Sequence, residues 1–380
     1  MDLVGKDMAS LTRNIRALLT PETQVLRRMA QYYFHRDGKH VRPLLVLLTS
    51  QAVRATVPVG AVPPTPRTAP GAPADRASIN SSISPALTGF GSIDAVVGAD
   101  GILPAQRRLA EIAEMIHTAS LLHDDVIDGS STRRGVPSVN AEQGNKMAIL
   151  AGDYLLARAS MALARLRHCE VVELLAAVIA DLVEGEVMQL RNTAGADTAP
   201  ANGWQSPSPV PVPGGSSPAL DHYLEKTYLK TASLMAKSCQ AAAVLGGAPQ
   251  TISATADTYG KHLGLAFQLV DDMLDFTASA ADFGKPAGGA DLDLGLATAP
   301  VLFAAREHPE LLVMAERRFS GPGDAKRAFD LVHASQGLHL TREWAVAHAQ
   351  FAVQAISVWP ATPARDALVG MAEKVLTRSK

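Results

Sequence analysis

Apolar residues recur along most of this chain at the spacing of an α-helix, about 3.6 residues per turn. The pattern is longest over residues 44–53, 110–122, 171–190 and 228–245. No segment of comparable length alternates apolar and polar residues as a half-buried β-strand would. The pattern therefore predicts an all-α protein.

Two segments interrupt this helical pattern, at about residues 56–102 and 192–218, and both are rich in Pro, Ala, Gly and Ser. Such composition predicts loosely ordered inserts in the connections between helices. A tolerated loop expansion is the simpler interpretation, and a Pro-rich partner-binding role for the second insert is the alternative. Apart from these inserts, residues 1–380 are expected to form a single domain.

Composition narrows the class of protein. The chain has 380 residues, of which 47% are hydrophobic, so it is long enough to bury a large core. Its net charge of −2 gives no indication of nucleic-acid binding. Two cysteines, Cys169 and Cys239, suit a reducing compartment without a disulfide framework. No uninterrupted apolar run reaches about 18 residues, so at most a peripheral association with membranes is expected.

The pattern Asp-Asp-x-x-Asp occurs twice, each time inside a helical stretch with apolar flanks. The first copy comprises Asp124, Asp125 and Asp128, and the second comprises Asp271, Asp272 and Asp275. In a helix the first and last aspartates of each copy share a face. Such carboxylates repel one another unless a cation neutralises them, and Mg²⁺ prefers one or two carboxylates together with substrate phosphates. The repeat predicts a magnesium–diphosphate site, whereas a single copy would fit a solvated acidic face equally well.

The placement of the first copy supports a functional interpretation. Gly129 is expected to end the helix, because glycine is the preferred residue just after a helix. Asp128 would then lie at the negative end of the helix dipole, where a carboxylate is unfavourable. An unfavourable placement that is repeated along the chain indicates a function.

Basic residues lie beside the acidic ones. Lys39 and Arg42 are three residues apart, Arg133 and Arg134 follow the first motif, and His117 precedes it by about two helical turns. Arginine binds phosphate oxygens through two parallel hydrogen bonds, and lysine acts as a point charge. Any one of these residues alone would be an ordinary surface cation or a partly buried histidine. Together they predict a second anionic ligand that is bound without metal.

With these residues the chain resembles the trans-isoprenyl diphosphate synthases, specifically the long-chain polyprenyl members that make quinone side chains. The resemblance covers nearly the whole chain except the two inserts. It is carried by GKHVRPLL, EMIHTASLLHDDVIDGSSTRRG, GNKMAILAGDYLLARAS, YLKTASLMAKSC, AFQLVDDMLDF, GKP followed by ADLDLGLATAP, GLHLTREWA and VLTRSK. It implies an isoprenoid synthase-type helical bundle around a central apolar cavity. It also implies Mg²⁺-dependent, head-to-tail condensation of isopentenyl diphosphate onto an allylic diphosphate, farnesyl or geranylgeranyl diphosphate, for ubiquinone synthesis.

The resemblance implies a role for each matching position. The six aspartates match ligands of the Mg²⁺ ions on the allylic diphosphate, and Arg133 and Lys285 match residues that bind that diphosphate. The isopentenyl diphosphate site matches Lys39, Arg42, His117 and Arg134. The residues beside the breaking C–O bond match Lys230, Thr231 and Gln268. One departure follows Lys285-Pro286, where the sequence AGGADL has one more glycine than the family pattern.

Product length is expected to depend on Ala119 and Ser120, about one helical turn before Asp124. A Phe or Tyr at these positions would block the path of the growing chain, as in the family's short-chain members. The small side chains favour a product of six to ten isoprene units, as the resemblance implies. Close packing of a buried helix is the alternative reason for small residues here.

Other proteins share parts of this pattern. A terpene cyclase would carry the first acidic motif but would lack the second and the GKxxRP sequence. A non-catalytic subunit of a heteromeric synthase would commonly lose an aspartate motif or the basic site. Glu114 and His117 have the Glu-x-x-His spacing of di-iron bundles, but a second such pair is absent from the sequence.

The resemblance also implies a homodimer, with a heteromeric assembly as the alternative, and a mitochondrial location. The first residues, MDLVGKDMASLTRNIRALL, contain Asp2 and Asp7 and do not read as an acid-poor, Arg-rich leader. The location is therefore expected from the resemblance alone.

Overall fold

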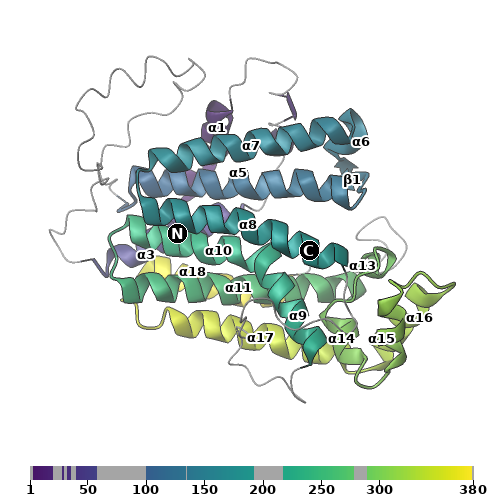
Figure 1. Cartoon of the computed structure of the whole chain (residues 1–380). Coiled ribbons are helices and arrows are strands. Elements are labelled where there is room, and N and C mark those ends of the chain that lie inside the picture. The colour runs from purple at the N-terminus through teal and green to yellow at the C-terminus, as the bar shows by residue number, and fades with distance from the viewer. Residues whose placement is uncertain are drawn as a thin grey trace. The chain divides into compact units, whose positions relative to one another are not determined.

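The computed structural model describes residues 3–19, 28–29, 32–35, 40–57, 100–133, 135–191, 217–277 and 289–378. Helices dominate these residues (Figure 1). The strands among them are β1 (Thr132–Arg133) and β2 (Val136–Pro137), a short antiparallel pair in which Thr132 faces Pro137. The prediction of an all-α protein is confirmed. Most of both predicted inserts, residues 58–99 and 192–216, lies outside the described residues.

The chain divides into two compact units, each built from separate stretches. Unit 1 comprises residues 1–177, 237–256 and 359–366, and unit 2 comprises residues 178–236, 257–358 and 367–380. The division falls inside α8 (Cys169–Arg191), α10 (Ser233–Leu245), α11 (Gln250–Thr277) and α18 (Pro363–Thr377). The other helices of unit 1 are α1 (Gly5–Leu18), η1 (Tyr32–His35), α3 (Val41–Arg54), α5 (Pro104–Ile127), α6 (Val139–Gln143) and α7 (Asn145–Arg165). All four stretches singled out by their apolar pattern lie within observed helices.

In unit 1, α5 and α7 run side by side (Figure 1). Gly152 on α7 lies directly against the imidazole of His123 on α5, and a Cβ at this position would collide with the ring. The missing side chain therefore allows α7 to approach the end of α5 that carries the first acidic motif.

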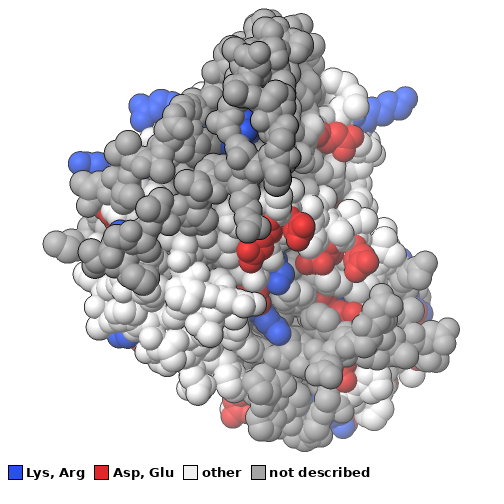
Figure 2. Space-filling view, turned by 60° about the vertical axis from the view of Figure 1, so that its left-hand side comes forward, with Lys and Arg blue, Asp and Glu red and all other residues white. Residues whose placement is uncertain are grey.

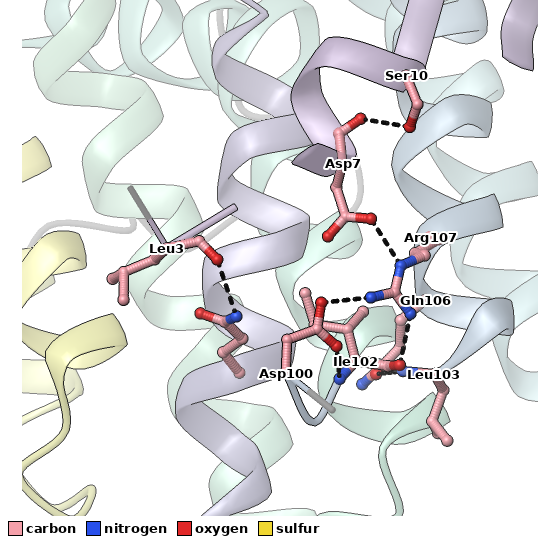
Figure 3. A network of polar contacts seen from close by, with 9 residues as sticks. Leu3, Asp7, Ser10, Asp100, Ile102, Leu103, Gln106 and Arg107 are labelled. Carbon is pink, nitrogen blue, oxygen red and sulfur yellow. Dashed lines mark hydrogen bonds and ion pairs between the residues drawn. The ribbon is translucent and has the colours of Figure 1, made fainter. Parts of the chain in front are cut away.

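The start of α5 is fixed by a polar network around Arg107 (Figure 3). Its guanidinium donates to Asp7 of α1 at 2.7 Å, to Asp100 at 2.5 Å and to the Ile102 carbonyl at 2.6 Å. In addition, the Gln106 side chain accepts from the Leu103 backbone N–H at 2.9 Å and donates to the Ala242 carbonyl at 2.8 Å. The bond from the Leu103 N–H satisfies a backbone group that the beginning of a helix leaves without an intrahelical partner.

Among the described helices, α7 is long and apolar enough to cross a membrane by length and composition. The sequence-based expectation, drawn from uninterrupted apolar runs, did not single it out. Core helices pass the same criterion, and the buried residues of α7, such as Ala151, Leu155 and Ala159, belong to the core of unit 1. Composition alone therefore says little about a membrane here.

The helices that lie wholly in unit 2 are α9 (Pro218–Thr227), η4 (Tyr228–Ala232), α13 (Ala290–Asp293), α14 (Ala299–Ala304), α15 (Glu310–Glu316), α16 (Asp324–Ala334) and α17 (Gly337–Ala355). Phe276, Leu292, Val301, Leu311 and Val332 belong to a buried apolar cluster that joins the end of α11 to helices α13 to α16. This cluster anchors the end of the helix that carries the second acidic motif.

Two glycines bring α11 unusually close to the segment before it. A Cβ on Gly264 would lie 2.6 Å from the Ala232 Cα, and one on Gly260 would lie 2.6 Å from the Ala236 Cα. Real Cβ atoms do not approach neighbouring backbone this closely, so these positions require glycine. The close approach sets the distance between the side chains of η4 and those of α11.

Candidate active site

The first acidic motif lies at the end of α5, in unit 1. The helix ends at Ile127 and Gly129 has φ = +62°, as predicted. Asp125 is only 1% exposed. Its Oδ1 accepts hydrogen bonds from Arg133 at 2.7 Å, and its Oδ2 accepts one from the Tyr33 hydroxyl at 2.5 Å. The middle aspartate is therefore neutralised and held by the protein itself.

The short hairpin after α5 places Arg133 for this contact. Asn140 of α6 donates to the carbonyls of Asp125 and Ser130 at 3.0 Å, and the Ser138 hydroxyl donates to Ser130 at 2.6 Å. Burial, reinforced by the neighbouring Asp125, raises the pKa of the Tyr33 hydroxyl, which therefore stays neutral and donates its proton.

The two outer aspartates of this motif differ from the middle one. Asp124 and Asp128 are half-buried, and Asp128 is the residue that caps the end of α5. Each motif thus separates into a middle carboxylate that is fully engaged within the protein and outer carboxylates that reach solvent. Periodicity placed the middle aspartate to the side of the face shared by the outer two, but it did not show that the middle one is buried.

The basic residues around α3 are only partly described. His40 adopts a left-handed conformation, φ = 42°, at the start of α3, and its Nδ1 lies 2.8 Å from Glu114 Oε1 on α5. Arg42 and His117 are half-buried. Lys39 and Arg134 lie outside the described residues. In the described part of the chain, no three His, Cys, Asp or Glu side chains form a group that could hold a metal by themselves.

In unit 2, Lys230 and Thr231 lie in η4, a π-helical turn, a local widening that is frequent at functional sites. The Lys230 ammonium forms an ion pair with Glu186 and donates to Gln189 Oε1 at 2.9 Å, both on α8. A Cβ on Gly185 would lie 2.6 Å from the Lys230 side chain, so this glycine leaves room for the lysine.

A chain of hydrogen bonds links η4 to the second acidic motif. The Thr231 hydroxyl donates to Gln268 Oε1 at 3.0 Å, and Gln268 Nε2 donates to Asp272 Oδ1 at 2.9 Å. Asp272 is 2% exposed, and its Oδ2 accepts from the Tyr223 hydroxyl at 2.6 Å. Burial raises the pKa of Asp272, and the hydrogen bonds from Tyr223 and Gln268 oppose that effect.

The outer aspartates of the second motif also have protein partners. Asp271 forms an ion pair with Arg378 of the C-terminal segment. Both carboxylate oxygens of Asp275 accept backbone N–H groups at the start of α13, from Ala290 and Asp291, at 3.1 Å. Gly289, with φ = +95°, makes this tight approach possible. Lys285, which precedes this turn, lies outside the described residues.

Asp291 and Lys226 add charge to the second motif. Burial raises the pKa of Asp291 well above its usual range, and the nearby Asp272 and Asp275 raise it further. Burial lowers the pKa of Lys226, one helical turn before Lys230, while Asp272 and Asp291 favour its charged form. The acidic cluster is thus four carboxylates rather than three, with a lysine of the same unit beside it.

On the face that Figure 2 presents, acidic side chains gather near the middle, with basic side chains among them. Most other described residues visible on this face are uncharged. Mixed charge of this kind suits a ligand that carries phosphate groups together with cations.

The polyprenyl synthetase family matches residues 23–332 of the chain. The chain belongs to this family. It is 54% identical over 384 residues to a probable mitochondrial hexaprenyl pyrophosphate synthase of Neurospora crassa, with all of this chain and 81% of that protein covered. It is 43% identical over 382 residues to subunit 1 of the decaprenyl-diphosphate synthase of Schizosaccharomyces pombe, covering all of this chain and 91% of the relative.

A solved structure shows the same fold. The polyprenyl synthase of Caulobacter crescentus, complexed with calcium and isoprenyl diphosphate, is 29% identical and superposes with a TM-score of 0.75 over all of this chain and 96% of the other. The predicted resemblance and the isoprenoid synthase fold are therefore confirmed. The roles given to individual residues remain predictions.

Several partners of this polyprenyl synthetase site were not found from its sequence. They are Tyr33, Asn140, Glu186, Gln189, Tyr223, Lys226, Asp291 and Arg378. Lys226 carried a usable signal, since it precedes Lys230 by one helical turn. Asp291, in the segment ADLDLGLATAP, belonged to the quoted resemblance but was given no role. Tyr33 and Tyr223 carried no comparable signal, because they contact aspartates that are distant in sequence.

Proposed function

We propose that this chain is a long-chain, all-trans polyprenyl diphosphate synthase that supplies the side chain of ubiquinone in mitochondria. It would condense isopentenyl diphosphate head-to-tail onto farnesyl or geranylgeranyl diphosphate. The relatives named as hexaprenyl and decaprenyl synthases support the substrate class. Within the structure, the proposal depends most on the chain of hydrogen bonds from Thr231 through Gln268 to Asp272.

Magnesium is the proposed metal. The outer aspartates Asp124, Asp128 and Asp271 are partly exposed oxygen donors, which suits a hard cation that also keeps water and phosphate ligands. Asp125 and Asp272 are buried and hydrogen-bonded within the protein, so we assign them to positioning the motifs rather than to direct ligation. Asp275 is also half-buried and is proposed as a further oxygen donor of the second motif. When bound, the metal stabilises the negative charge that develops on the departing diphosphate.

The side chains contribute the rest of the electrostatic stabilisation. Arg133 and Lys285 are proposed to bind the allylic diphosphate, and Lys39, Arg42, His117 and Arg134 the isopentenyl diphosphate. The C–O bond of the allylic diphosphate breaks, the isopentenyl double bond forms a C–C bond to the allylic carbon, and the proton lost from the isopentenyl unit passes to the departing diphosphate. Lys230 stabilises the departing diphosphate as negative charge develops on it. The oxygens of Thr231 and Gln268 would stabilise the positive carbon, and no side chain needs to act as a nucleophile.

The product is proposed to have six to ten isoprene units. Ala119 is buried and Ser120 is half-buried with its hydroxyl donating to the His117 carbonyl at 2.9 Å, so neither side chain is large enough to obstruct a growing chain. The central apolar cavity itself remains a prediction.

We propose that the whole chain acts as one synthase domain, because the family match extends over residues of both units. A homodimer is the proposed assembly. Val183, Val187 and Leu190 are 61%, 43% and 53% exposed, and they form an apolar stripe on α8 at helical spacing. Exposed apolar stripes of this kind commonly mark an interface. A heteromer is the alternative, since one relative is named as a subunit.

The test is prenyl transfer by the purified chain with Mg²⁺, farnesyl diphosphate and labelled isopentenyl diphosphate, with products resolved by length. A product of six to ten units, lost in Asp124→Ala and Asp271→Ala, is expected. Lack of incorporation by the folded chain, restored by a second subunit, would favour the heteromer. No incorporation under either condition would refute the proposed activity.

A further inference from the structure

Arg378, one residue beyond the end of α18, reaches the first aspartate of the second acidic motif. Its guanidinium forms an ion pair with Asp271 and donates to the Phe267 carbonyl at 2.8 Å. The guanidinium carbon also lies 3.8 Å from the centre of the Phe267 ring. All three contacts fall within one turn of α11, and the Arg378 side chain is only 12% exposed.

Phe267 holds this cation independently of Asp271. Residues four apart in a helix share a face, so the ring and the carboxylate are neighbours along α11. A guanidinium over an aromatic ring is attracted by the ring's quadrupole, and the carbonyl adds a hydrogen bond. The position of the Arg378 guanidinium beside Asp271 therefore does not depend on the ion pair alone.

Asp271 is bound directly by a cationic side chain. Asp272 and Asp275 accept hydrogen bonds from neutral donors, namely a tyrosine, an amide and backbone N–H groups. Asp271 is paired with a full positive charge, yet its side chain is 42% exposed. A dissolved cation can thus reach the carboxylate, but it meets the charge of Arg378 there.

We propose that Arg378 is the built-in counter-ion of Asp271, which a divalent metal must displace from the carboxylate. This inference rests on the proposed function, which makes Asp271 a metal ligand. Arg378 is on this view a positioning residue. It neutralises the second motif before the metal arrives and weakens the binding of metal by the substrate-free protein.

The test is a titration of the full-length, substrate-free protein with Mn²⁺, which has the same charge as Mg²⁺ and also prefers oxygen ligands. Electron paramagnetic resonance measures the concentration of free Mn²⁺ at each step. Arg378→Gln removes the competing charge, so its Kd for Mn²⁺ should fall about two- to fivefold, as for loss of a partly exposed ion pair. Lys374→Gln is the matched control, because Lys374 is an exposed cation on α18, one helical turn before Arg378. It should leave the Kd unchanged.

A double-mutant cycle separates competition at Asp271 from a general effect of charge. In the Asp271→Asn background, Arg378→Gln should no longer change the Kd for Mn²⁺. Arg378→Lys keeps the positive charge, so its Kd for Mn²⁺ should stay closer to that of the wild type. It also provides a second variant if Arg378→Gln does not fold. Three outcomes would overturn the inference. Arg378→Gln could leave the affinity for Mn²⁺ unchanged or weaken it, Arg378→Gln could change the Kd equally in the Asp271→Asn background, or no variant could bind Mn²⁺. Because prenyl transfer is measured separately, failure of the proposed activity would be recognised by itself.

Discussion

The Thr231 hydroxyl donates a 3.0 Å hydrogen bond to the amide oxygen of Gln268, which joins the π-helical turn η4 to α11. That bond fixes the orientation of the amide, since Gln268 must then donate through its nitrogen to Asp272. A threonine, a glutamine and the middle aspartate of an acidic motif therefore act as one unit. The glycines of α11 allow the two segments to come close enough for this bond.

Gly264→Ala should disrupt this contact. The new Cβ would lie 2.6 Å from the Ala232 Cα, next to Thr231, so the two helices would have to separate. We expect a loss of about 1–3 kcal/mol in the free energy of unfolding and reduced prenyl transfer. Urea denaturation and a steady-state assay measure the two effects. Gly370→Ala on α18 is the control, because nothing lies within 4 Å of its added Cβ, and it should be neutral or slightly stabilising. Equal behaviour of the two variants would contradict this account.

Substitutions of the middle and the first aspartate of the first acidic motif should differ in their effect on stability, although both reduce activity. Asp125→Ala leaves the half-buried Arg133 and Tyr33 without this partner, so it should cost about 1–3 kcal/mol of stability in addition to activity. Asp124→Ala removes a half-buried carboxylate and should abolish activity while changing stability by less than about 1 kcal/mol. Thermal unfolding beside the prenyl-transfer assay distinguishes them. If both variants lost the same stability, the assignment of Asp125 to positioning would be wrong.

A buried histidine pair should make unit 2 sensitive to acid. His262 Nδ1 and His348 Nδ1 are 2.9 Å apart, so one ring donates to the other while both are neutral. Burial, together with the charge of Lys261, lowers the pKa of His262 to about 4, and burial, together with His262 and Lys261, lowers the pKa of His348 to about 3. Below about pH 6.5 the unfolded chain binds protons that the folded chain does not, so stability falls as the pH decreases towards 4.

The expected slope is up to about 1.4 kcal/mol per pH unit for each histidine. Urea unfolding at pH 7, 6 and 5 measures it. His262→Asn removes one titrating group and should flatten the dependence, whereas His339→Asn, at an exposed position, should not. A dependence on pH that is the same in all three proteins would exclude the pair as its source.

Ser120→Phe should shorten the product. The residue lies one turn before Asp124 on α5 and is half-buried, so a phenyl ring can enter the proposed path of the growing chain without first overpacking a closed core. We expect products of fewer isoprene units with the first condensation largely retained. Thin-layer or mass-spectrometric resolution of the products decides the question. Products of unchanged length would move the determinant of length away from this turn.

The helices and the family were predictable from the amino-acid pattern. Long apolar patterns placed α3, α5, α8 and α10 because burial of one face follows a period of 3.6 residues wherever the chain packs. Gly129 marked the end of α5 for a local reason, since a positive φ costs glycine little. The two acidic motifs and their basic neighbours were likewise visible, because the residues of each lie within a few turns.

The surroundings of each carboxylate depend on contacts between distant segments, which the sequence did not reveal. Asp125 and Asp272 look like their neighbours in the sequence, yet they are buried against Tyr33 and Tyr223, which are 92 and 49 residues away. Arg378, which meets Asp271, comes from a separate, C-terminal stretch of unit 2. Spacing along a helix fixes which face a side chain occupies. The cost of burying a charge is met by donors on other segments, and only packing brings those segments to the carboxylate.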